Sequence, residues 1–300
     1  MTKKYSQLLL VGVLVLSFLL VGTVAFAQDD EKCDNPDSLT FSVIPTEDIA
    51  LHAKRYQPLL DWLKENTGKN IEFYAPTSYN GVIEAMRSDF VDIAGFGAFS
   101  YILAHDKANA EVFAARIDTT TNEQGYYSYM ITRKDSGIES LEDLEGKTFA
   151  FTDPGSTSGN LIPSYIFKKA GIKPQEFLKR TIFAGGHQSA ALAVKRGQVD
   201  ASAVASTVYQ RMSDRGEINP DNVVVFKKSS LLPLAPQTYR GDLCDNLKKD
   251  IREAYLTFAD EAPNAETLLE PMGAIRFETM QDSDFDRIRD IIEVMDVQVG

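Results

Sequence analysis

The sequence predicts an α/β protein with two lobes of similar construction. First, the 300 residues are 44% hydrophobic and 10% aromatic, an ordinary globular composition that excludes disorder or a collagen-like fibre. Second, short apolar runs alternate with helical patterns, as in βαβ units whose parallel sheet is covered on both faces. Third, a helical segment at 84–87 leads to a strand at 91–94 that begins Val-Asp, and the same pattern recurs at 193–196 and 199–202. This weak internal repeat favours two lobes.

The first part of the chain contains three predicted strand–helix pairs. Residues 39–44 form a buried strand, and the helix at 49–66 carries Leu51, Leu59 and Leu63 at helical spacing before Gly68 stops it. The other predicted elements here are strands at 70–74 and 91–95 and helices at 79–87 and 98–105.

A second series of elements begins near residue 126. Strands are predicted at 128–133, 148–152, 180–183, 199–203 and 223–226, and helices at 141–144, 159–170 and 189–196. After a proline-rich crossing at 232–236, the C-terminal part is predicted to be helical, at 245–259, 264–269 and 283–294.

The first 27 residues predict a secretory signal peptide. Lys3 and Lys4 precede an apolar run at 8–21, and Ala25-Phe26-Ala27 is a small-residue cleavage pattern, so we expect cleavage after Ala27. A retained membrane anchor is the alternative, because residues 8–27 are nearly long enough to span a bilayer.

Charge and cysteine content narrow the class of protein. The formal net charge is -12, from 43 acidic and 31 basic residues, and nucleic acid is an unexpected partner because its binders need a basic face. Cys33 and Cys244 are the two cysteines of the chain. In an oxidising compartment such a pair is more often bridged than catalytic, so we predict a disulfide between them.

The segment richest in chemistry lies at 152–160, Thr-Asp-Pro-Gly-Ser-Thr-Ser-Gly-Asn, between a predicted strand and a predicted helix. Its glycines permit tight backbone geometry, its hydroxyls are short donors, and the helix start offers unpaired N–H groups and a positive dipole end. This combination suits an anion. Plain N-capping is the alternative, since Ser and Thr are preferred N-cap residues. A Walker loop is excluded, because no Gly-Lys-Ser/Thr ends the segment.

Two further strand-to-helix turns are expected at the same edge of the sheets. They lie at 94–98 and at 184–189, and the second places His187 just before a helix. Such turns gather at the carboxyl ends of parallel strands, where ligands bind, so His187 is a candidate donor to an oxyanion. His52 and His105 have no partner at metal-ligand spacing, so we interpret both as structural residues and predict no metal site.

Catalysis is a competing hypothesis for the same segment. Residues 155–159, Gly-Ser-Thr-Ser-Gly, superficially resemble a nucleophile elbow, with His187 as base and Asp153 as orienting acid. The central position, however, is Thr157 rather than Ser, and Asp153 lies too close in sequence to be an independent triad member. We therefore expect no enzyme, with a secreted ester or phosphate hydrolase that uses Ser156 and Thr157 as the alternative.

Five segments, taken together, point to a family. They are residues 75–83 (APTSYNGVI), 91–97 (VDIAGFG), 125–128 (GYYS), 153–159 (DPGSTSG) and 184–187 (AGGH). With these segments the mature chain resembles, over nearly its whole length, the substrate-binding proteins of bacterial phosphonate, phosphite and phosphate ABC importers, which are type II periplasmic binding proteins.

The resemblance implies two α/β lobes, each a mostly parallel sheet flanked by helices, which close on a ligand in the cleft between them. On this basis lobe 1 is predicted at residues 28–124 plus 236–300 and lobe 2 at 125–235. The resemblance also implies the residues that meet the phosphorus oxyanion, namely Tyr79, Tyr126, Ser156, Thr157, Ser158 and His187. None of these is Lys or Arg, so neutral donors and helix ends are expected to provide the binding energy.

Departures from the family pattern favour a compact ligand. Relatives that take an aminoalkylphosphonate hold its ammonium with acidic side chains at the positions that match Thr207 and Ala235, and neither is acidic here. A buried ammonium without a carboxylate is poorly compensated. We therefore predict phosphite first and methylphosphonate second, with phosphate or 2-aminoethylphosphonate as alternatives.

The expected partners follow from the same resemblance. The protein should deliver its ligand to an ABC transporter permease from the periplasm, as a monomer and without a cofactor.

Overall fold

The structure is a computed structural model and describes residues 33–297. The predicted signal peptide and its cleavage site lie outside the described residues. Among the described residues, no helix combines the length and the apolar character that crossing a bilayer requires.

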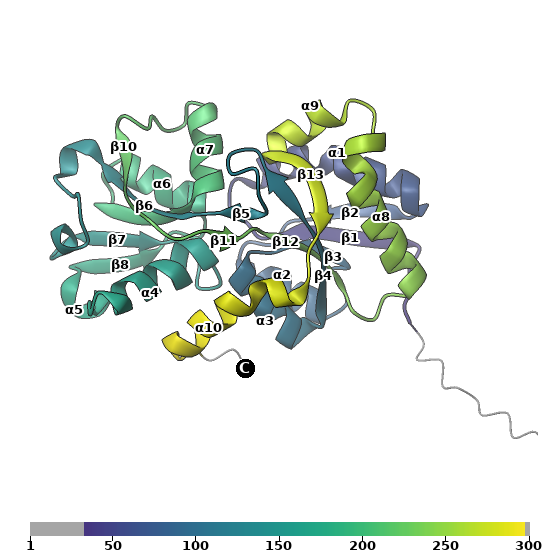
Figure 1. Cartoon of the computed structure of the whole chain (residues 1–300), viewed down its shortest axis with the longest axis horizontal. Coiled ribbons are helices and arrows are strands. Elements are labelled where there is room, and N and C mark those ends of the chain that lie inside the picture. The colour runs from purple at the N-terminus through teal and green to yellow at the C-terminus, as the bar shows by residue number, and fades with distance from the viewer. Residues whose placement is uncertain (1–32, 298–300) are drawn as a thin grey trace, which may run out of the picture. The chain divides into compact units, whose positions relative to one another are not determined.

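The larger of two main sheets has six strands in the order β13-β4-β12-β3-β1-β2. Its strands are β1 (Ser38–Val43), β2 (Asn70–Tyr74), β3 (Ile93–Gly95), β4 (Ala110–Asp118), β12 (Pro236–Arg240) and β13 (Ala274–Thr279). The helices that pack on it are α1 (Ile49–Thr67), α2 (Tyr79–Arg87), α3 (Ala98–Ala108), α8 (Asp245–Glu261), α9 (Ala265–Leu269) and α10 (Asp286–Met295). In Figure 1, α1, α8 and α9 lie on one side of this sheet and α2, α3 and α10 on the other.

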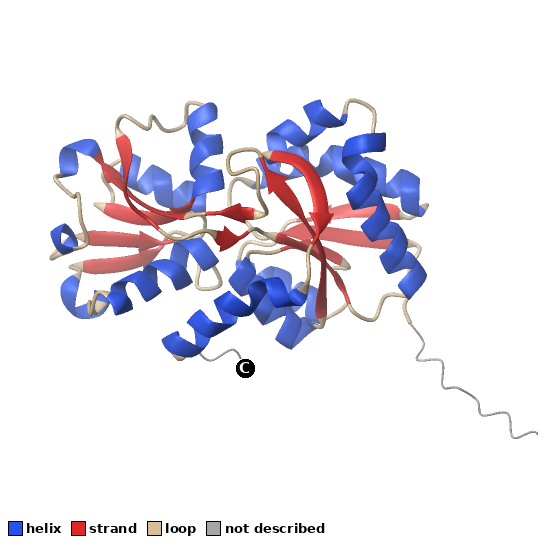
Figure 2. Cartoon of the chain, viewed as in Figure 1, coloured by secondary structure: helices blue, strands red, loops and turns tan. Residues whose placement is uncertain are grey.

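The smaller main sheet has five strands in the order β10-β6-β9-β7-β8. They are β6 (Ser128–Arg133), β7 (Thr148–Phe151), β8 (Arg180–Phe183), β9 (Ala201–Ala205) and β10 (Val223–Lys228), accompanied by α4 (Ile162–Lys169), α5 (Pro174–Phe177), α6 (His187–Lys195) and α7 (Ser206–Asp214). Two short paired strands, β5 (Gly125–Tyr126) and β11 (Leu232–Pro233), lie on the two chain segments that connect the sheets. Figure 2 shows strands flanked by helices on both sides of these connections. The residue limits of the two lobes remain a prediction.

The α/β class and many element positions agree with the sequence prediction, but the parallel character of the sheets was overestimated. β1 pairs in parallel with β2 and β3, and β7 with β8 and β9, as βαβ units require. β12, β4, β13, β6 and β10 enter the sheets through antiparallel pairings. Both sheets are therefore mixed, because the chain crosses between them and returns in the opposite direction.

The sequence prediction lacks β4, β12, β13 and α7, as well as the short elements β5, β11 and α5. The C-terminal part is accordingly not wholly helical, since β13 interrupts it. Two predicted helices also differ in form. Residues Glu142–Leu144 make a single 3-10 turn, and the helix expected at 159–170 begins with a π-helical turn, Thr157–Leu161, before α4.

The predicted disulfide is present between Cys33 and Cys244, which are 211 residues apart in sequence. It lies just beyond the end of β12, where the Asp34 N–H donates to the Asp242 carbonyl and the Cys244 N–H donates to the Asp34 carbonyl. The bond therefore fixes the start of the described chain to the residue that precedes α8.

Candidate functional site

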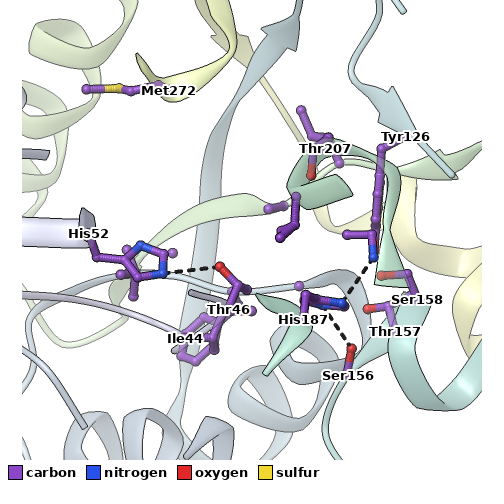
Figure 3. A pocket seen from close by; sticks show the side chains of 18 of the residues that line it. Ile44, Thr46, His52, Tyr126, Ser156, Thr157, Ser158, His187, Thr207 and Met272 are labelled. Atoms are coloured by element: carbon purple, nitrogen blue, oxygen red, sulfur yellow. Dashed lines mark hydrogen bonds between the residues drawn. The ribbon is translucent and has the colours of Figure 1, made fainter. Parts of the chain in front are cut away.

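The strongest candidate site is a cavity of about 80 Å³ whose walls come from both main sheets and from the segments that connect them. Its polar lining contains all six predicted ligand contacts: Tyr79, Tyr126, Ser156, Thr157, Ser158 and His187. Figure 3 shows Ser156, Thr157, Ser158, Tyr126 and His187 on one side of this cavity and His52 and Met272 on the other.

The serine–threonine segment, residues 156–158, is held at the start of the helical run that leads into α4. Ser156 is the N-cap residue, and its Oγ accepts from the Gly159 N–H at 3.0 Å. A Cβ at Gly159 would overlap the Thr152 side chain, so glycine is required for this tight turn. Ser156 and Thr157 are almost fully buried, so their hydroxyls face a water-poor space.

His187 is fixed as a neutral donor. Its Nδ1 accepts from the Ala205 backbone N–H at 3.0 Å, which leaves the ring proton on Nε2. Nε2 lies 3.5 Å from Ser156 Oγ (Figure 3). Burial lowers the pKa of His187 to about 3, so the ring is uncharged at neutral pH. His187 can therefore offer one N–H to a bound oxyanion but no positive charge.

The hydroxyl of Thr157 is positioned by α3, one of the helices of the larger sheet. Its Oγ1 accepts from the Phe99 N–H in the first turn of α3 at 2.8 Å. Because Ser156 Oγ and Thr157 Oγ1 each already accept from a backbone N–H, both hydroxyl protons remain available for a ligand oxygen. The contact also joins the two walls of the cavity.

The two tyrosines complete the donor set. The Tyr79 hydroxyl is buried and has no hydrogen-bond partner within residues 33–297, so it is a donor that a ligand would satisfy. Burial raises the pKa of Tyr126, and the neighbouring Ser158 and Thr157 partly oppose this rise. Both phenols are therefore protonated donors at neutral pH.

The turn before His187 differs from its expected role as a ligand-binding helix start. The His187 and Gln188 N–H groups both donate to the Thr46 carbonyl, at 2.9 and 3.1 Å. Gly186 allows this approach, since a Cβ there would meet the Pro45 carbonyl oxygen at 2.8 Å. This helix start therefore binds the loop between β1 and α1, and only the His187 side chain is left for a ligand.

The cavity also contains residues that the sequence analysis missed or set aside. Arg55, Arg116 and Arg211 line it, and so does His52, which was interpreted as structural. His52 Nε2 accepts from the Glu47 N–H and contacts Thr46 Oγ1, both at 3.2 Å, and burial lowers the pKa of His52 to about 4. The one sequence signal was position, because Arg55 and His52 fall on the buried stripe of α1 with Leu59 and Leu63.

A single carboxylate faces three of the arginines near the cavity. The Glu47 side chain is fully buried and accepts from Arg55 at 3.0 Å, Arg211 at 2.6 Å and Arg215 at 2.8 Å. Burial alone would raise the pKa of Glu47, but the charges of Arg211 and Arg55 outweigh it and hold the pKa far below its usual range. This end of the cavity therefore carries excess positive charge.

The geometry does not form a catalytic triad. The Asp153 carboxylate accepts from the backbone N–H groups of Gly155 at 2.8 Å and Tyr79 at 3.4 Å, whereas His187 Nδ1 is occupied by the Ala205 N–H. His187 thus has no orienting carboxylate among its hydrogen-bond partners, as a triad base requires. Among residues 33–297, no group of three or more His, Cys, Asp or Glu residues is placed to hold a metal.

A donor-lined cavity walled by two α/β sheets, with two connecting segments, defines a substrate-binding protein of the periplasmic binding-protein type. A family model described as "ABC transporter, phosphonate, periplasmic substrate-binding protein" matches residues 41–285. The chain therefore belongs to this family of ABC-transporter binding proteins. The family consists of transport proteins and not enzymes, so the hydrolase alternative is set aside.

Curated relatives agree with this assignment. The chain is 32% identical over 301 residues to the phosphonates-binding periplasmic protein of Escherichia coli K12, covering 99% of this chain and 86% of that protein. It is 34% identical over 206 residues to the phosphate-import protein PhnD of Mycolicibacterium smegmatis (66% of this chain, 64% of that protein). It is 22% identical over 268 residues to the probable ABC transporter phosphite binding protein PhnD1 of Prochlorococcus marinus (86% and 89%).

Solved structures support the fold. The binding-protein component of an ABC phosphonate transporter from Pseudomonas aeruginosa superposes with a TM-score of 0.81 at 30% identity, covering 89% of this chain and 90% of that one. PhnD1 from Prochlorococcus marinus, in complex with methylphosphonate, superposes with a TM-score of 0.80 at 21% identity, covering 87% and 99%. The chain thus has the type II periplasmic binding-protein fold.

Proposed function

We propose that the protein captures a small phosphorus oxyanion, phosphite first and methylphosphonate second, and delivers it to the permease of an ABC importer. The observation that carries this proposal is the set of neutral donors at one end of the cavity. The His187 Nε2–H, the Ser156 and Thr157 hydroxyls and the unpartnered Tyr79 hydroxyl surround one buried space. Tyr126 and Ser158 add further donors there.

Such a donor set suits an oxyanion because backbone contacts already position the His187 ring and the Ser156 and Thr157 hydroxyl groups. Donors fixed before binding lose little entropy when the ligand arrives, and hydrogen bonds to an anion are stronger than neutral ones. The Arg55, Arg116 and Arg211 charges at the other end add attraction to an anion. The sequence-based expectation that neutral donors and helix ends provide the binding energy is amended here by the contribution of these arginines.

Apolar lining favours phosphite or methylphosphonate over phosphate. Ile44, Phe96, Val208 and Leu234 contribute carbon surface to the cavity. A P–H or P–CH₃ group can face such a surface, whereas the additional oxygen of phosphate would be left without a partner, at a cost of about 1 to 3 kcal/mol. PhnD1 of Prochlorococcus marinus, which is named as a probable phosphite binding protein and was solved in complex with methylphosphonate, supports these two ligands, while the phosphate-import relative keeps phosphate as the alternative.

The cavity is poorly suited to an aminoalkylphosphonate. Thr207 and Ala235, the two positions matched to ammonium-binding acids in relatives, both line it. Among the described residues of the lining there is no Asp or Glu, whereas there are three Arg. A ligand ammonium would therefore be repelled and left unpaired.

The cellular setting follows from the family. We propose secretion through the signal peptide at residues 1–27, action in the periplasm as a monomer, and release of the ligand when the two walls of the cavity separate at the permease.

The test is calorimetric titration of residues 28–300 with phosphite, methylphosphonate, phosphate and 2-aminoethylphosphonate at one pH and salt concentration. Phosphite or methylphosphonate should bind most tightly, with the aminoalkyl ligand about a hundredfold weaker. Tightest binding of the aminoalkyl ligand would overturn the meaning assigned to Thr207 and Ala235, and no binding at all would overturn the proposed function.

A variant pair tests the donor set. His187→Ala and Thr157→Ala should each weaken phosphite binding about tenfold or more without unfolding the protein. His105→Ala is the matched control, since His105 is exposed and bonded to Asp106. Unchanged affinity in both site variants would refute the assignment.

A further inference from the structure

The arginine end of the cavity, Arg55, Arg116 and Arg211, has no assigned ligand group when a compact oxyanion occupies the donor end. The three side chains come from α1, β4 and α7, so neither main sheet supplies all of them. The carboxylates that pair with them do not line the cavity: Glu47 pairs with Arg55 and Arg211, and Asp118 pairs with Arg116.

Arg116 is the least satisfied of the three. Its Nη2 lies 3.4 Å from Asp118 Oδ2, which is long for a charge-assisted hydrogen bond, and its Nε is buried without a partner within residues 33–297. Burial lowers the pKa of Arg116, the Asp118 charge opposes this, and the nearby Arg211 lowers it further. The guanidinium thus lies in a desolvated space with another positive charge close by.

The arginine end and the donor end belong to one continuous space. The same cavity, of about 80 Å³, is lined by His187 and Tyr126 at one end and by Arg55, Arg116 and Arg211 at the other. A ligand bound at the donor end can therefore extend toward the arginines.

We propose that the arginine end binds a second anionic group of the ligand, so that the cavity takes phosphonates whose short substituent ends in a carboxylate. This inference rests on the proposed function, because the phosphonate group is held by the donor end. A carboxylate would supply the negative charge that this end of the lining lacks, and guanidinium–carboxylate pairs are among the stronger contacts in a desolvated site.

The proposal predicts discrimination between two ligands of nearly equal shape. Phosphonoacetate ends in a carboxylate, and phosphonoacetamide replaces it with a neutral amide. The cavity should bind phosphonoacetate about tenfold more tightly than phosphonoacetamide. Phosphite and methylphosphonate, titrated in parallel, report on binding by ligands that have no second anionic group.

Variants separate the two ends of the cavity. In Arg116→Gln the preference for phosphonoacetate over phosphonoacetamide should fall to about threefold or less, and this ratio is independent of any general loss of charge attraction that phosphite binding shares. The double variant Arg116→Gln with Asp118→Asn avoids an unpaired Asp118 and should show the same loss. Arg276→Gln is the control, since it changes net charge equally but Arg276 is exposed on β13 and paired with Glu278.

The outcomes distinguish this inference from the proposed function. If phosphite binds and phosphonoacetate binds no more tightly than phosphonoacetamide, the second anion site is wrong and the proposed function stands. If the acetate binds well and neither phosphite nor methylphosphonate does, the second anion site stands and the proposed ligand order falls. If none of the four binds, both are overturned. A preference that survives in both Arg116 variants also overturns the inference.

Discussion

At the scale of single residues, a substitution of Tyr79 should affect ligand binding without reducing stability. Within residues 33–297 the Tyr79 hydroxyl is buried without a hydrogen-bond partner, so its removal should not cost stability. We predict that Tyr79→Phe leaves the free energy of unfolding unchanged or raises it by up to about 1 kcal/mol, and weakens phosphite binding about tenfold. Urea unfolding without ligand and calorimetric titration measure the two effects.

Tyr101→Phe is the matched control for that prediction. The Tyr101 hydroxyl donates to Asp282 Oδ1 at 2.7 Å, and Tyr101 does not line the cavity. This variant should lose about 1 to 2 kcal/mol of stability and keep its affinity. A stability loss in Tyr79→Phe as large as in Tyr101→Phe would show that the Tyr79 hydroxyl has a structural partner after all.

Two buried histidines predict a pH dependence of stability. Burial lowers the pKa of His187 to about 3 and of His52 to about 4, whereas both should titrate near 6.5 in the unfolded chain. Between about pH 4 and pH 6.5 the unfolded chain therefore binds more protons, and stability rises with pH through this window. Each histidine should cost about 2 kcal/mol at pH 5 relative to pH 7.5.

Urea unfolding at several pH values measures this effect in the absence of ligand. His52→Gln should remove about half of the loss between pH 7.5 and pH 5, and His105→Gln, at an exposed position, should leave it unchanged. Equal stability of the wild-type protein at both pH values would contradict the assignment of two neutral buried histidines.

At the scale of elements, the sequence predicted the helices and strands whose apolar pattern matches their burial in the fold. β2, α2, β6 and β8 have the predicted limits, because apolar periodicity and turn residues bound them. β12 was missed because Pro236, Gln237, Thr238 and Arg240 are buried in the middle of the larger sheet without an apolar pattern. Their burial depends on distant partners, such as the Arg240 Nε donation to Asp92 at 2.8 Å.

The candidate site follows the same division. The donor end was predictable because Gly, Ser, Thr and His at strand-to-helix turns carry a local signal. Arg116 lies on β4 and Arg211 on α7, and neither element was predicted. The two arginines line one cavity because the topology of the fold brings β4 and α7 together, which no local sequence pattern indicates.

Glu47 connects elements of the two main sheets and should be the most sensitive carboxylate of the protein. It lies between β1 and α1, and it accepts from Arg55 on α1, Arg211 on α7 and Arg215 just after α7. Glu47→Gln leaves three arginines without their shared counter-charge, so the free energy of unfolding should fall by about 3 kcal/mol, measured by urea unfolding at neutral pH.

Glu217→Gln is the control for Glu47, because it removes the same charge from a partner of Arg215. The Glu217 side chain is 25% exposed, so its ion pair is screened and its loss should cost about 1 kcal/mol or less. Similar losses in both variants would mean that burial and connection of the two sheets add nothing to the Glu47 contacts.

At the scale of the whole molecule, the Cys33–Cys244 disulfide closes a loop that contains most of the described chain. It restricts the unfolded chain, and the loop includes every strand of the smaller sheet. Neither cysteine lines the cavity, so the bond should affect folding without affecting ligand contacts.

The double variant Cys33→Ala with Cys244→Ala should therefore unfold at lower urea concentration, with a loss of about 2 to 5 kcal/mol in the free energy of unfolding. Its affinity for phosphite should stay within about twofold of the wild type, because the donors and arginines of the cavity are untouched. Reduction of the wild-type protein with dithiothreitol should reproduce the stability loss and leave the double variant unchanged. If the double variant were as stable as the oxidised wild type, the hydrogen bonds of Asp34 with Asp242 and Cys244 would suffice to hold the chain start, and the entropic role of the disulfide would be refuted.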